Sequence, residues 1–337
     1  MSSNSLRKEI DKPLDARGLR SALERWYDRN RRDLPWRRTR DPYAIWVSEI
    51  MLQQTRVAAV IPYYQRFMSV FPNAASLASA PEERVLAMWS GLGYYSRARN
   101  MQKAASRVAQ NGVFPPNFDS IRSLPGIGDY TAAAVSSIAF GLPHAAVDGN
   151  VRRVVVRLLN DDSADVKGHA SQLLDRKDPG RWNQAVMELG ATICTPRDPC
   201  CEECPVALYC EAHRHGTQES LPSKRTKPAP EQLERTLVIV HHRGRILLTP
   251  SSRVKGFWDL PEIIDGIPSG EIHAGLSLGW FRHTITHRHY KFIVCEGTAG
   301  KARSGKQYLW VAQRKLTEIA LSTTAKKALR LADRAVQ

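Results

Sequence analysis

The sequence predicts a mainly α-helical domain followed by a smaller α+β domain. Amphipathic segments joined by Gly- and Pro-containing turns run from residue 16 to about residue 212, and none of them alternates as a strand does. Residues 216–232 then combine prolines, small polar residues and basic charges without apolar periodicity, which is typical of a linker. β-Branched runs begin only after this linker. A chain of 337 residues is long enough for two such cores.

Helix start signals support the first domain. Residues 16–30 repeat apolar side chains at helical spacing. Asp41 followed by Pro42 supplies an N-cap and a first-turn proline, and Pro81 opens another helix in the same way. We therefore expect an all-α domain over residues 1–215.

The second domain, residues 233–337, begins with a hairpin signal. Two β-branched or apolar runs, 236–240 and 245–249, are separated by the short polar stretch His-His-Arg-Gly. Further expected elements are strands over 290–299 and 306–313 and a closing helix over 316–332.

The chain is strongly basic, with a formal net charge of +16 at pH 7. Lys and Arg outnumber Asp and Glu by 32 to 24 up to residue 230 and by 17 to 9 after it, so both halves carry the same excess. We expect one polyanion that contacts both halves, a nucleic acid before a membrane surface. A solvated surface without a partner is the alternative.

Membrane and export signals are missing from the sequence. No run approaches the roughly 20 apolar residues of a bilayer span, and the first twelve residues lack the apolar core of a signal peptide. We therefore expect no membrane partner and a cytoplasmic, nucleoid-associated location in a bacterial cell. In that reducing compartment cysteines are ligands or free thiols before they are disulfides.

Five of the six cysteines lie within seventeen residues. Four of them have the spacing C-x6-C-x2-C-x5-C, and thiolates this close repel one another unless a cation or cluster holds them. A single short loop that supplies four ligands suits a [4Fe–4S] cluster, whereas structural zinc, the alternative, normally takes two separated ligand pairs. The loop could then present Arg197 to a phosphate. Cys200 points elsewhere and Cys295 is a small core residue in this interpretation. The expected ligands are Cys194, Cys201, Cys204 and Cys210.

Gly126 and Gly128 lie in a short turn between two helical segments. Glycine lets the backbone approach a ligand closely, and the unpaired N–H groups of the next helix start bind phosphate. The turn predicts a helix-hairpin-helix clamp on a DNA backbone, with an ordinary tight turn as the alternative. Asp129 suits the helix dipole but would repel a phosphate that came too close.

Two carboxyl groups are candidates for acid chemistry. Asp148 opens an amphipathic helix, and an N-cap role alone would explain it. Glu49 lies among apolar and aromatic residues, where burial raises a carboxyl pKa and keeps the group protonated. One protonated and one ionised carboxyl group are what glycosidic cleavage through an oxocarbenium-like transition state requires.

Six features occur in order along residues 20–212: LPWR, VSEIMLQQT, GLGYYSRARN, LPGIGDYTA, VDGNV and the four-cysteine loop. Together they resemble the MutY adenine DNA glycosylases of the endonuclease III-like helix-hairpin-helix superfamily. The resemblance implies a monomer with a [4Fe–4S] cofactor. It implies removal of adenine opposite 8-oxoguanine or guanine from double-stranded DNA, as a step of base excision repair.

The resemblance also assigns roles to single residues. In the lyase members of the superfamily a lysine that forms a Schiff base stands where this chain has Tyr130, so base removal without efficient strand nicking is implied. Glu49 would protonate adenine N7, and Asp148 would stabilise the sugar cation with support from Asn150 and Tyr130. The other implied contacts are Gln54 and Tyr94 as wedges in the base stack, and Trp36, Arg37, Leu52 and Glu188 in the adenine pocket. Core packing remains an alternative for Trp36 and Leu52, as does a buried ion pair for Glu188.

The stretch GFWDLPE, Gly256 to Glu262, resembles the C-terminal domain of the family, which shares its fold with the Nudix hydrolase MutT. The hydrolase needs a metal-binding Arg-Glu-x-x-Glu-Glu run, which this sequence lacks, so a recognition role is implied. Family members recognise 8-oxoguanine with a Phe-Ser-His loop, and the matching residues are Ile285, Thr286 and His287. Thr286 keeps a hydroxyl, whereas Ile285 replaces an aromatic ring. Phosphate contact is the alternative for this loop.

Two other functions are alternatives to adenine excision. A lyase-type glycosylase for oxidised pyrimidines is disfavoured by Tyr130 and by the second domain. A non-catalytic iron–sulfur DNA-binding module would keep the cluster and the clamp but would need neither Glu49 nor Asp148, so the carboxyl pair decides against it.

Overall fold

The computed structural model describes residues 15–223, 229–264, 271–285, 287–300 and 307–335. Among them, every α-helix except the last one precedes Gly216 and every strand follows it, which is the order that the sequence predicts. The first strand begins at Glu231, two residues inside the predicted linker 216–232. The contacts divide the chain differently from the predicted domains 1–215 and 233–337. Unit 1 is Met1–Ile61 with Arg107–Arg225, and unit 2 is Pro62–Ser106 with Thr226–Gln337.

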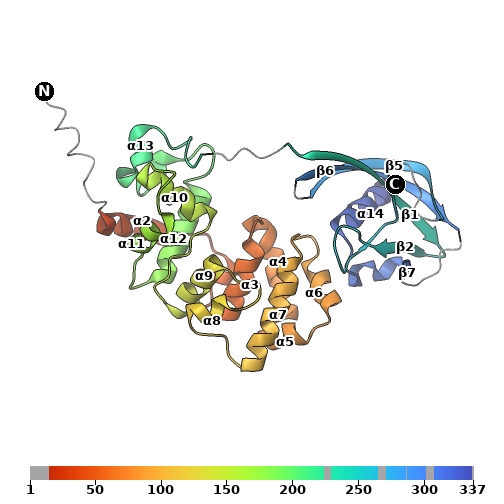
Figure 1. The fold of residues 1–337 in the computed structure, drawn as a ribbon, viewed down its shortest axis with the longest axis horizontal. Helices are drawn as coiled ribbons and strands as arrows, with labels where there is room; N and C mark the ends of the chain where they lie inside the picture. The colour runs from red at the N-terminus through yellow and green to blue at the C-terminus, as the bar shows by residue number, and fades with distance from the viewer. Residues whose placement is uncertain (1–14, 224–228, 265–270, 286, 301–306, 336–337) are drawn as a thin grey trace. The chain divides into compact units, whose positions relative to one another are not determined.

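Unit 1 is helical (Figure 1). One of its helices, α3 (Pro42–Leu52), begins at a signal noted above: Asp41 caps it by accepting from the backbone N–H groups of Tyr43 and Ala44. Within the described residues, no helix of either unit is long and apolar enough to cross a bilayer. The helices of unit 1 are α2 (Ala16–Asn30), η1 (Pro35–Arg37), α3 (Pro42–Leu52), α8 (Phe118–Arg122), α9 (Asp129–Phe140), α10 (Gly149–Leu159), α11 (Val166–Leu173), α12 (Pro179–Thr192), η2 (Cys201–Glu203), η3 (Ala207–Tyr209) and α13 (Glu211–His215), together with the start of α4 (Val57–Val70) and the end of α7 (Ser96–Asn111).

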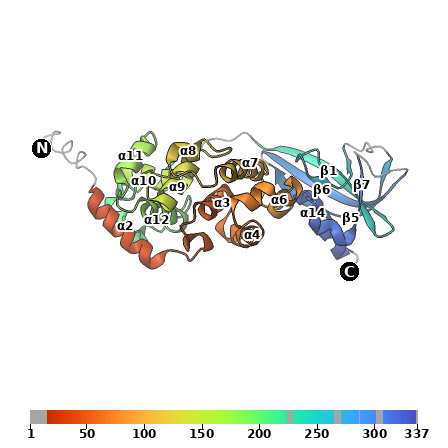
Figure 2. The ribbon, with the colours of Figure 1, turned by 90° about the horizontal axis from the view of Figure 1, so that it is seen from below.

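One core of unit 1 lies where α2 runs beside α12 (Figure 2). Leu19, Leu23 and Tyr27 form the buried face of α2, and they pack with apolar residues of α10, α11 and α12. Helices α10 and α12 approach closely at Gly190, where an added Cβ would lie 2.6 Å from the Asn150 Cβ. This close approach fixes the start of α10 against the last turn of α12.

Unit 2 combines helices with a seven-stranded mixed sheet. Its helical part packs on its sheet part: the Tyr95 and Phe257 ring centroids are 4.0 Å apart, and the Ser90 hydroxyl donates to the carbonyl oxygen of Leu321 at 2.7 Å. These contacts explain why residues 62–106 group with the C-terminal part. Besides most of α4 and α7, the elements are α5 (Ala74–Ser79), α6 (Glu82–Trp89), β1 (Glu231–His242), β2 (Arg245–Pro250), β3 (Trp258–Asp259), β4 (Glu262–Ile263), β5 (Ile272–Ile285), β6 (Arg288–Ala299), β7 (Leu309–Ala312), η4 (Gln313–Glu318) and α14 (Thr323–Ala335).

The sheet has the strand order β3-β2-β1-β6-β5, with β4 pairing with β1 and β7 with β2. Strands β1 and β6 are parallel, and β5 pairs with β6 in the antiparallel sense. Leu237 and Ile239 face the core shared with α14, whereas Val238 and Val240 face a second core. Because side chains alternate along a strand, this continuous apolar run covers both faces of the sheet.

The predicted closing helix over 316–332 is wrong at its start. A 3-10 helix ends at Glu318, Leu321 forms a parallel β-bridge with Trp258, and α14 begins at Thr323. The Ser322 hydroxyl accepts from the Ala325 N–H at 2.9 Å, which caps the new helix. The hydroxyl residues 322–324 therefore start a new helix at Thr323, separate from the first part of the predicted one.

Candidate active site

A cavity of about 650 Å³ lies in unit 1. Helices α3, α9, α10 and α12 each contribute side chains to it. The predicted site residues that line it are Trp36, Arg37, Glu49, Leu52, Gln54, Tyr130, Asp148, Asn150 and Glu188.

Glu49 is the acidic group that α3 places in this cavity. Its side chain is only 6% exposed, and every residue of α3 from Tyr43 to Met51 is buried. The pKa of Glu49 is raised to about 7: burial is the main cause and the nearby charge of Asp148 adds to it, while the hydrogen bond from Tyr130 and the charge of Arg37 oppose the rise. Glu49 can therefore hold a proton near neutral pH.

Tyr130 lies in the first turn of α9 and orients this acid. Its hydroxyl donates to Glu49 Oε2 at 2.6 Å and lies 3.3 Å from the sulfur of Met187. Burial raises the pKa of Tyr130 well above its ordinary value, so the phenol stays neutral. No amine occupies this position of the cavity lining.

Asp148 is the N-cap of α10, and it also lines the cavity. Oδ1 accepts from the Val151 N–H at 2.7 Å, and Oδ2 accepts from the Asn150 amide at 2.9 Å. Burial raises the pKa of Asp148, while these two donors and the charge of Arg153 oppose the rise. Asp148 therefore caps α10 and lines the cavity with the same carboxylate.

Arg153 connects this carboxylate to the cysteine loop. Its Nη2 donates to Asn150 Oδ1 at 2.9 Å and to the Gly190 carbonyl at 2.6 Å, and its Nε donates to the Cys194 carbonyl at 2.7 Å. Arg153 was not among the residues predicted from the sequence. The available signal was a pair of arginines four residues apart, Arg153 and Arg157, on the apolar face of an amphipathic helix.

Glu188 is fully engaged with two arginines. Its carboxylate accepts from Arg32 Nε and Nη2 at 2.7 Å each and from Arg37 Nη2 at 2.7 Å. Burial alone would raise the pKa of Glu188, but these bonds lower it to about 2. The buried ion pair is therefore present, and it holds Arg37 at the cavity wall. Arg32, which also lines the cavity, was not predicted.

The two predicted wedge residues have left-handed backbones. Gln54 has φ 57° and lies at the exposed rim of the unit 1 cavity. Tyr94 has φ 48°, belongs to unit 2, and its side chain is 51% exposed. Non-glycine residues in this region are uncommon and mark functional or strained positions.

The glycine turn forms the hairpin between α8 and α9. Gly126 has φ 77°, whereas Gly128 is the N-cap of α9 and an added Cβ there would meet nothing within 4 Å. Asp129 pairs with Arg122 at 2.5 Å and with Lys167 at 3.2 Å. These two cations lower the pKa of Asp129 and offset its charge beside the turn.

The four predicted cysteine ligands line one small cavity together with Arg157. Arg157 Nη1 donates to Cys194 Sγ at 3.3 Å, and Arg157 Nη2 is buried without a hydrogen-bond partner. Within the described parts of the chain, no three His, Cys, Asp or Glu groups converge on a point where a single metal ion could bind. Cys200 is exposed, and Cys295 is buried in β6.

The predicted lesion loop lies at the end of β5. Thr286 is outside the described residues. Ile285 lines a second cavity of about 450 Å³, all of whose lining residues belong to unit 2. The His287 carbonyl accepts from the Glu231 N–H at 3.1 Å. Tyr94 lines this second cavity as well.

Comparison with known proteins gives consistent matches. The sequence profile of HhH-GPD superfamily base excision DNA repair proteins matches residues 47–178. The human adenine DNA glycosylase is 47% identical over 222 residues, which cover 60% of this chain and 41% of the human protein. The adenine DNA glycosylase of Buchnera aphidicola from Acyrthosiphon pisum is 38% identical over 234 residues, 66% of this chain and 67% of the relative. The chain thus spans less than half the length of the human relative.

Solved structures agree on the fold of the helical part. A thermostable thymine-DNA glycosylase is 30% identical with a TM-score of 0.56, covering 59% of this chain and 97% of that one. An endonuclease III in non-covalent complex with DNA matches in fold, at 23% identity and a TM-score of 0.53, over 61% of this chain and 100% of that one. From the profile, the two curated relatives and this fold, the chain belongs to the adenine DNA glycosylase family of the helix-hairpin-helix superfamily.

Proposed function

We propose that this protein removes adenine paired with 8-oxoguanine or guanine from double-stranded DNA by hydrolysis of the N-glycosidic bond. The observation that carries the proposal is the pairing of Glu49, with its pKa near 7, and Asp148 in one cavity. Adenine would first be extruded from the duplex, at a cost of a few kcal/mol of stacking and pairing. The cavity of about 650 Å³ has room for the extruded base.

Glu49 acts as the general acid. In its protonated form it donates to N7 of adenine, which makes the base a better leaving group. Tyr130, which contacts Glu49 at 2.6 Å, holds the carboxyl group in place. Trp36, Arg37 and Leu52 line the same cavity and would contact the base.

Asp148 stabilises the oxocarbenium-like sugar as the bond breaks, and a water molecule completes the hydrolysis. Its hydrogen bonds from Val151 and Asn150 favour the ionised form that this role needs. Tyr130 offers no amine for a Schiff base, so the product is an abasic site in an intact strand.

We propose a [4Fe–4S] cluster as the cofactor, held by Cys194, Cys201, Cys204 and Cys210. Four thiols supplied by one short loop around one cavity suit a bulky cluster better than zinc, which normally takes two separated ligand pairs. Arg157, whose Nη2 is buried without a hydrogen-bond partner, lines the same cavity and would help to hold the cluster. When bound, the cluster would support the loop, which Arg153 ties to Asn150.

The remaining assignments follow from charge and from the second cavity. A net charge of +16 supports duplex DNA as the partner. Arg197 is exposed, and we propose that it contacts a phosphate of this DNA. We propose that the second cavity, lined by Ile285 and Tyr94, accepts the base opposite the adenine. A monomer in the bacterial cytoplasm completes the proposal.

Single-turnover release of adenine tests this function, with duplexes carrying A opposite 8-oxoguanine, G or T. Fast release opposite 8-oxoguanine, slower release opposite G and none opposite T are expected. Glu49→Gln should abolish release and leave duplex affinity within about twofold, while Glu24→Gln on α2, outside the cavity, serves as the control. If protein with an intact cluster binds DNA and releases no base, it is a non-catalytic binding module.

A further inference from the structure

The second cavity is lined by a histidine, His283, whose tautomer is set by a neighbouring lysine. His283, near the end of β5, lines the cavity, and Lys327 of α14 places its Nζ 3.2 Å from His283 Nδ1. An ammonium group can only donate, so Nδ1 accepts. Burial first, and then the charges of Lys327 and Arg253, lower the pKa of His283 to about 4. The neutral ring therefore carries its proton on Nε2.

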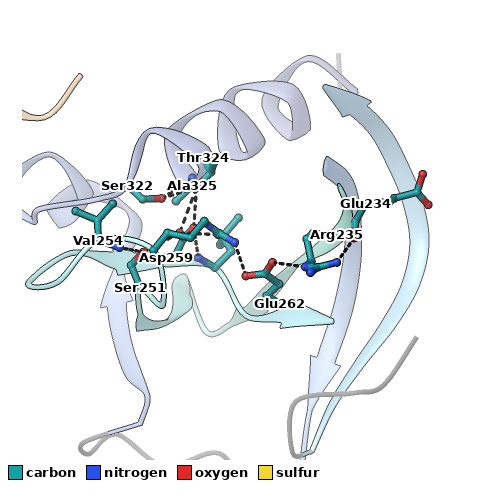
Figure 3. A network of polar contacts seen from close by, with 11 residues as sticks. Glu234, Arg235, Ser251, Val254, Asp259, Glu262, Ser322, Thr324 and Ala325 are labelled. Carbon is teal, nitrogen blue, oxygen red and sulfur yellow. Dashed lines mark hydrogen bonds and ion pairs between the residues drawn. The ribbon is translucent and has the colours of Figure 1, made fainter. Parts of the chain in front are cut away.

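The neighbouring cation of the cavity wall is already neutralised. Arg253 donates to Asp259 Oδ2 at 2.9 Å and to Glu262 Oε2 at 2.5 Å. Asp259 also accepts from Thr324 at 3.1 Å, so this network joins the segment after β2 to the start of α14 (Figure 3). Arg253 is thereby part of the wall of the cavity, and its charge is balanced by two carboxylates.

Lys327 differs from Arg253 in this respect. Among the described residues it forms no ion pair with a carboxylate, and its contacts are the His283 nitrogen and the face of the Phe281 ring, 5.8 Å from Nζ. Holding the charged Lys327 of α14 against the partly buried His283 of β5 removes water from the ammonium group, which costs free energy. With Nδ1 occupied by Lys327, the remaining N–H donor of this cavity-lining ring is Nε2.

The other walls suit a planar base. The aromatic and aliphatic surface of these walls comes from four residues: Leu92, Tyr94, Tyr95 and Ile285. Such walls accept guanine and 8-oxoguanine alike, because the two bases have nearly the same shape. Discrimination between them requires a polar group, since a site built to hydrogen-bond a substrate rejects the analogue that lacks the bonding atom.

Building on the proposed function, we infer that His283 is a specificity-determining residue that donates its Nε2–H to the C8 carbonyl oxygen of 8-oxoguanine. Lys327 is the positioning residue that keeps the proton on this nitrogen. Guanine carries C8–H at the same place and gains nothing from the donor.

The test is the ratio of single-turnover adenine release opposite 8-oxoguanine to release opposite G. Lys327→Met frees the imidazole to change tautomer, so the ratio should fall about tenfold, the worth of one hydrogen bond to a buried partner. Lys327→Arg, which still donates to Nδ1, and Arg330→Met, an exposed charge loss on the same helix, should keep the ratio. His283→Gln, whose amide nitrogen reaches the Nε2 position, should retain more preference than His283→Asn.

Three outcomes would overturn the inference. An unchanged ratio in Lys327→Met means that the tautomer has no role, and equal losses opposite both bases mean a contact to the DNA backbone. Equal ratios in His283→Gln and His283→Asn, with thermal unfolding near that of the parent, exclude the Nε2 donor even if Lys327→Met fails to fold. If the parent protein releases no adenine, the proposed function has failed, and the ratio of duplex affinities for the two bases replaces the rate ratio as the test.

Discussion

The pKa of Glu49 is set mainly by its burial and by the hydrogen bond from Tyr130, and this pKa should govern the pH dependence of excision. Its pKa of about 7 means that the acid form is present below this pH and is lost as the pH rises through it. We expect single-turnover rates on A opposite 8-oxoguanine to fall above about pH 7. In Tyr130→Phe the bond that favours the ionised form is gone, so the midpoint should move up by about one pH unit. A midpoint that moves down would contradict the assignment of Glu49 as the acid.

Glu188 has the opposite electrostatic character and should govern stability. Its folded pKa of about 2 lies below the ordinary value of 4.5, so its contribution is complete above about pH 4.5 and is lost as the pH falls through about 2. Glu188→Gln leaves Arg37 half-buried without its partner and should lower the free energy of unfolding at pH 7 by roughly 2–4 kcal/mol. Urea denaturation at pH 7 and at pH 3 measures both effects. A loss of stability that is as large at pH 3 as at pH 7 would count against the ion pairs.

At the scale of the element, Gly128 of the hairpin between α8 and α9 and Gly112 outside it should respond differently to substitution. Gly128→Ala places a methyl group in open space at the helix start, so it should cost at most about 1 kcal/mol of stability while blocking close approach of a phosphate. We expect an affinity loss of about tenfold for every duplex, whatever its bases. Gly112→Ala, at φ 74° outside the hairpin, should show the reverse pattern, with lower stability and unchanged affinity. Fluorescence anisotropy with matched and mismatched duplexes checks both.

Elements set by local chemistry could be predicted from the sequence. The N-caps Asp41 and Asp148 open helices where expected, and the β1–β2 hairpin lies where its β-branched runs are. Strand β5 was not predicted, because its exposed half carries small polar residues and two bulges interrupt its pairing. The parallel pairing of β1 with β6 is a contact between distant segments, and no local pattern encodes it.

The same division applies to the candidate site. Glu49 and Asp148 could be proposed because each stands in an environment that its neighbours in sequence define. Arg153 and Lys327 could not, because their roles depend on partners in other helices or strands: Cys194 and Gly190 for the first, His283 for the second. Long side chains on amphipathic helices look like surface residues until their partners are known.

At the scale of the whole molecule, the cysteine loop should decide whether unit 1 folds. Cys204→Ser removes one ligand of the proposed cluster, so we expect loss of the visible absorbance of iron–sulfur protein, a lower melting temperature and weak DNA binding. Cys200→Ser is the matched control, because Cys200 is exposed and does not line the loop cavity. Parent-like absorbance and melting in Cys204→Ser would rule out Cys204 as a ligand.

The hydrogen bond between Glu49 and Tyr130 joins residues that are 81 positions apart, and Asp148 arrives from a third helix. A chain released from synthesis before residue 148 would therefore carry Glu49 without the second carboxyl group of the proposed reaction. Such a fragment should release no adenine, because the two groups meet only when three helices far apart in the sequence have packed together.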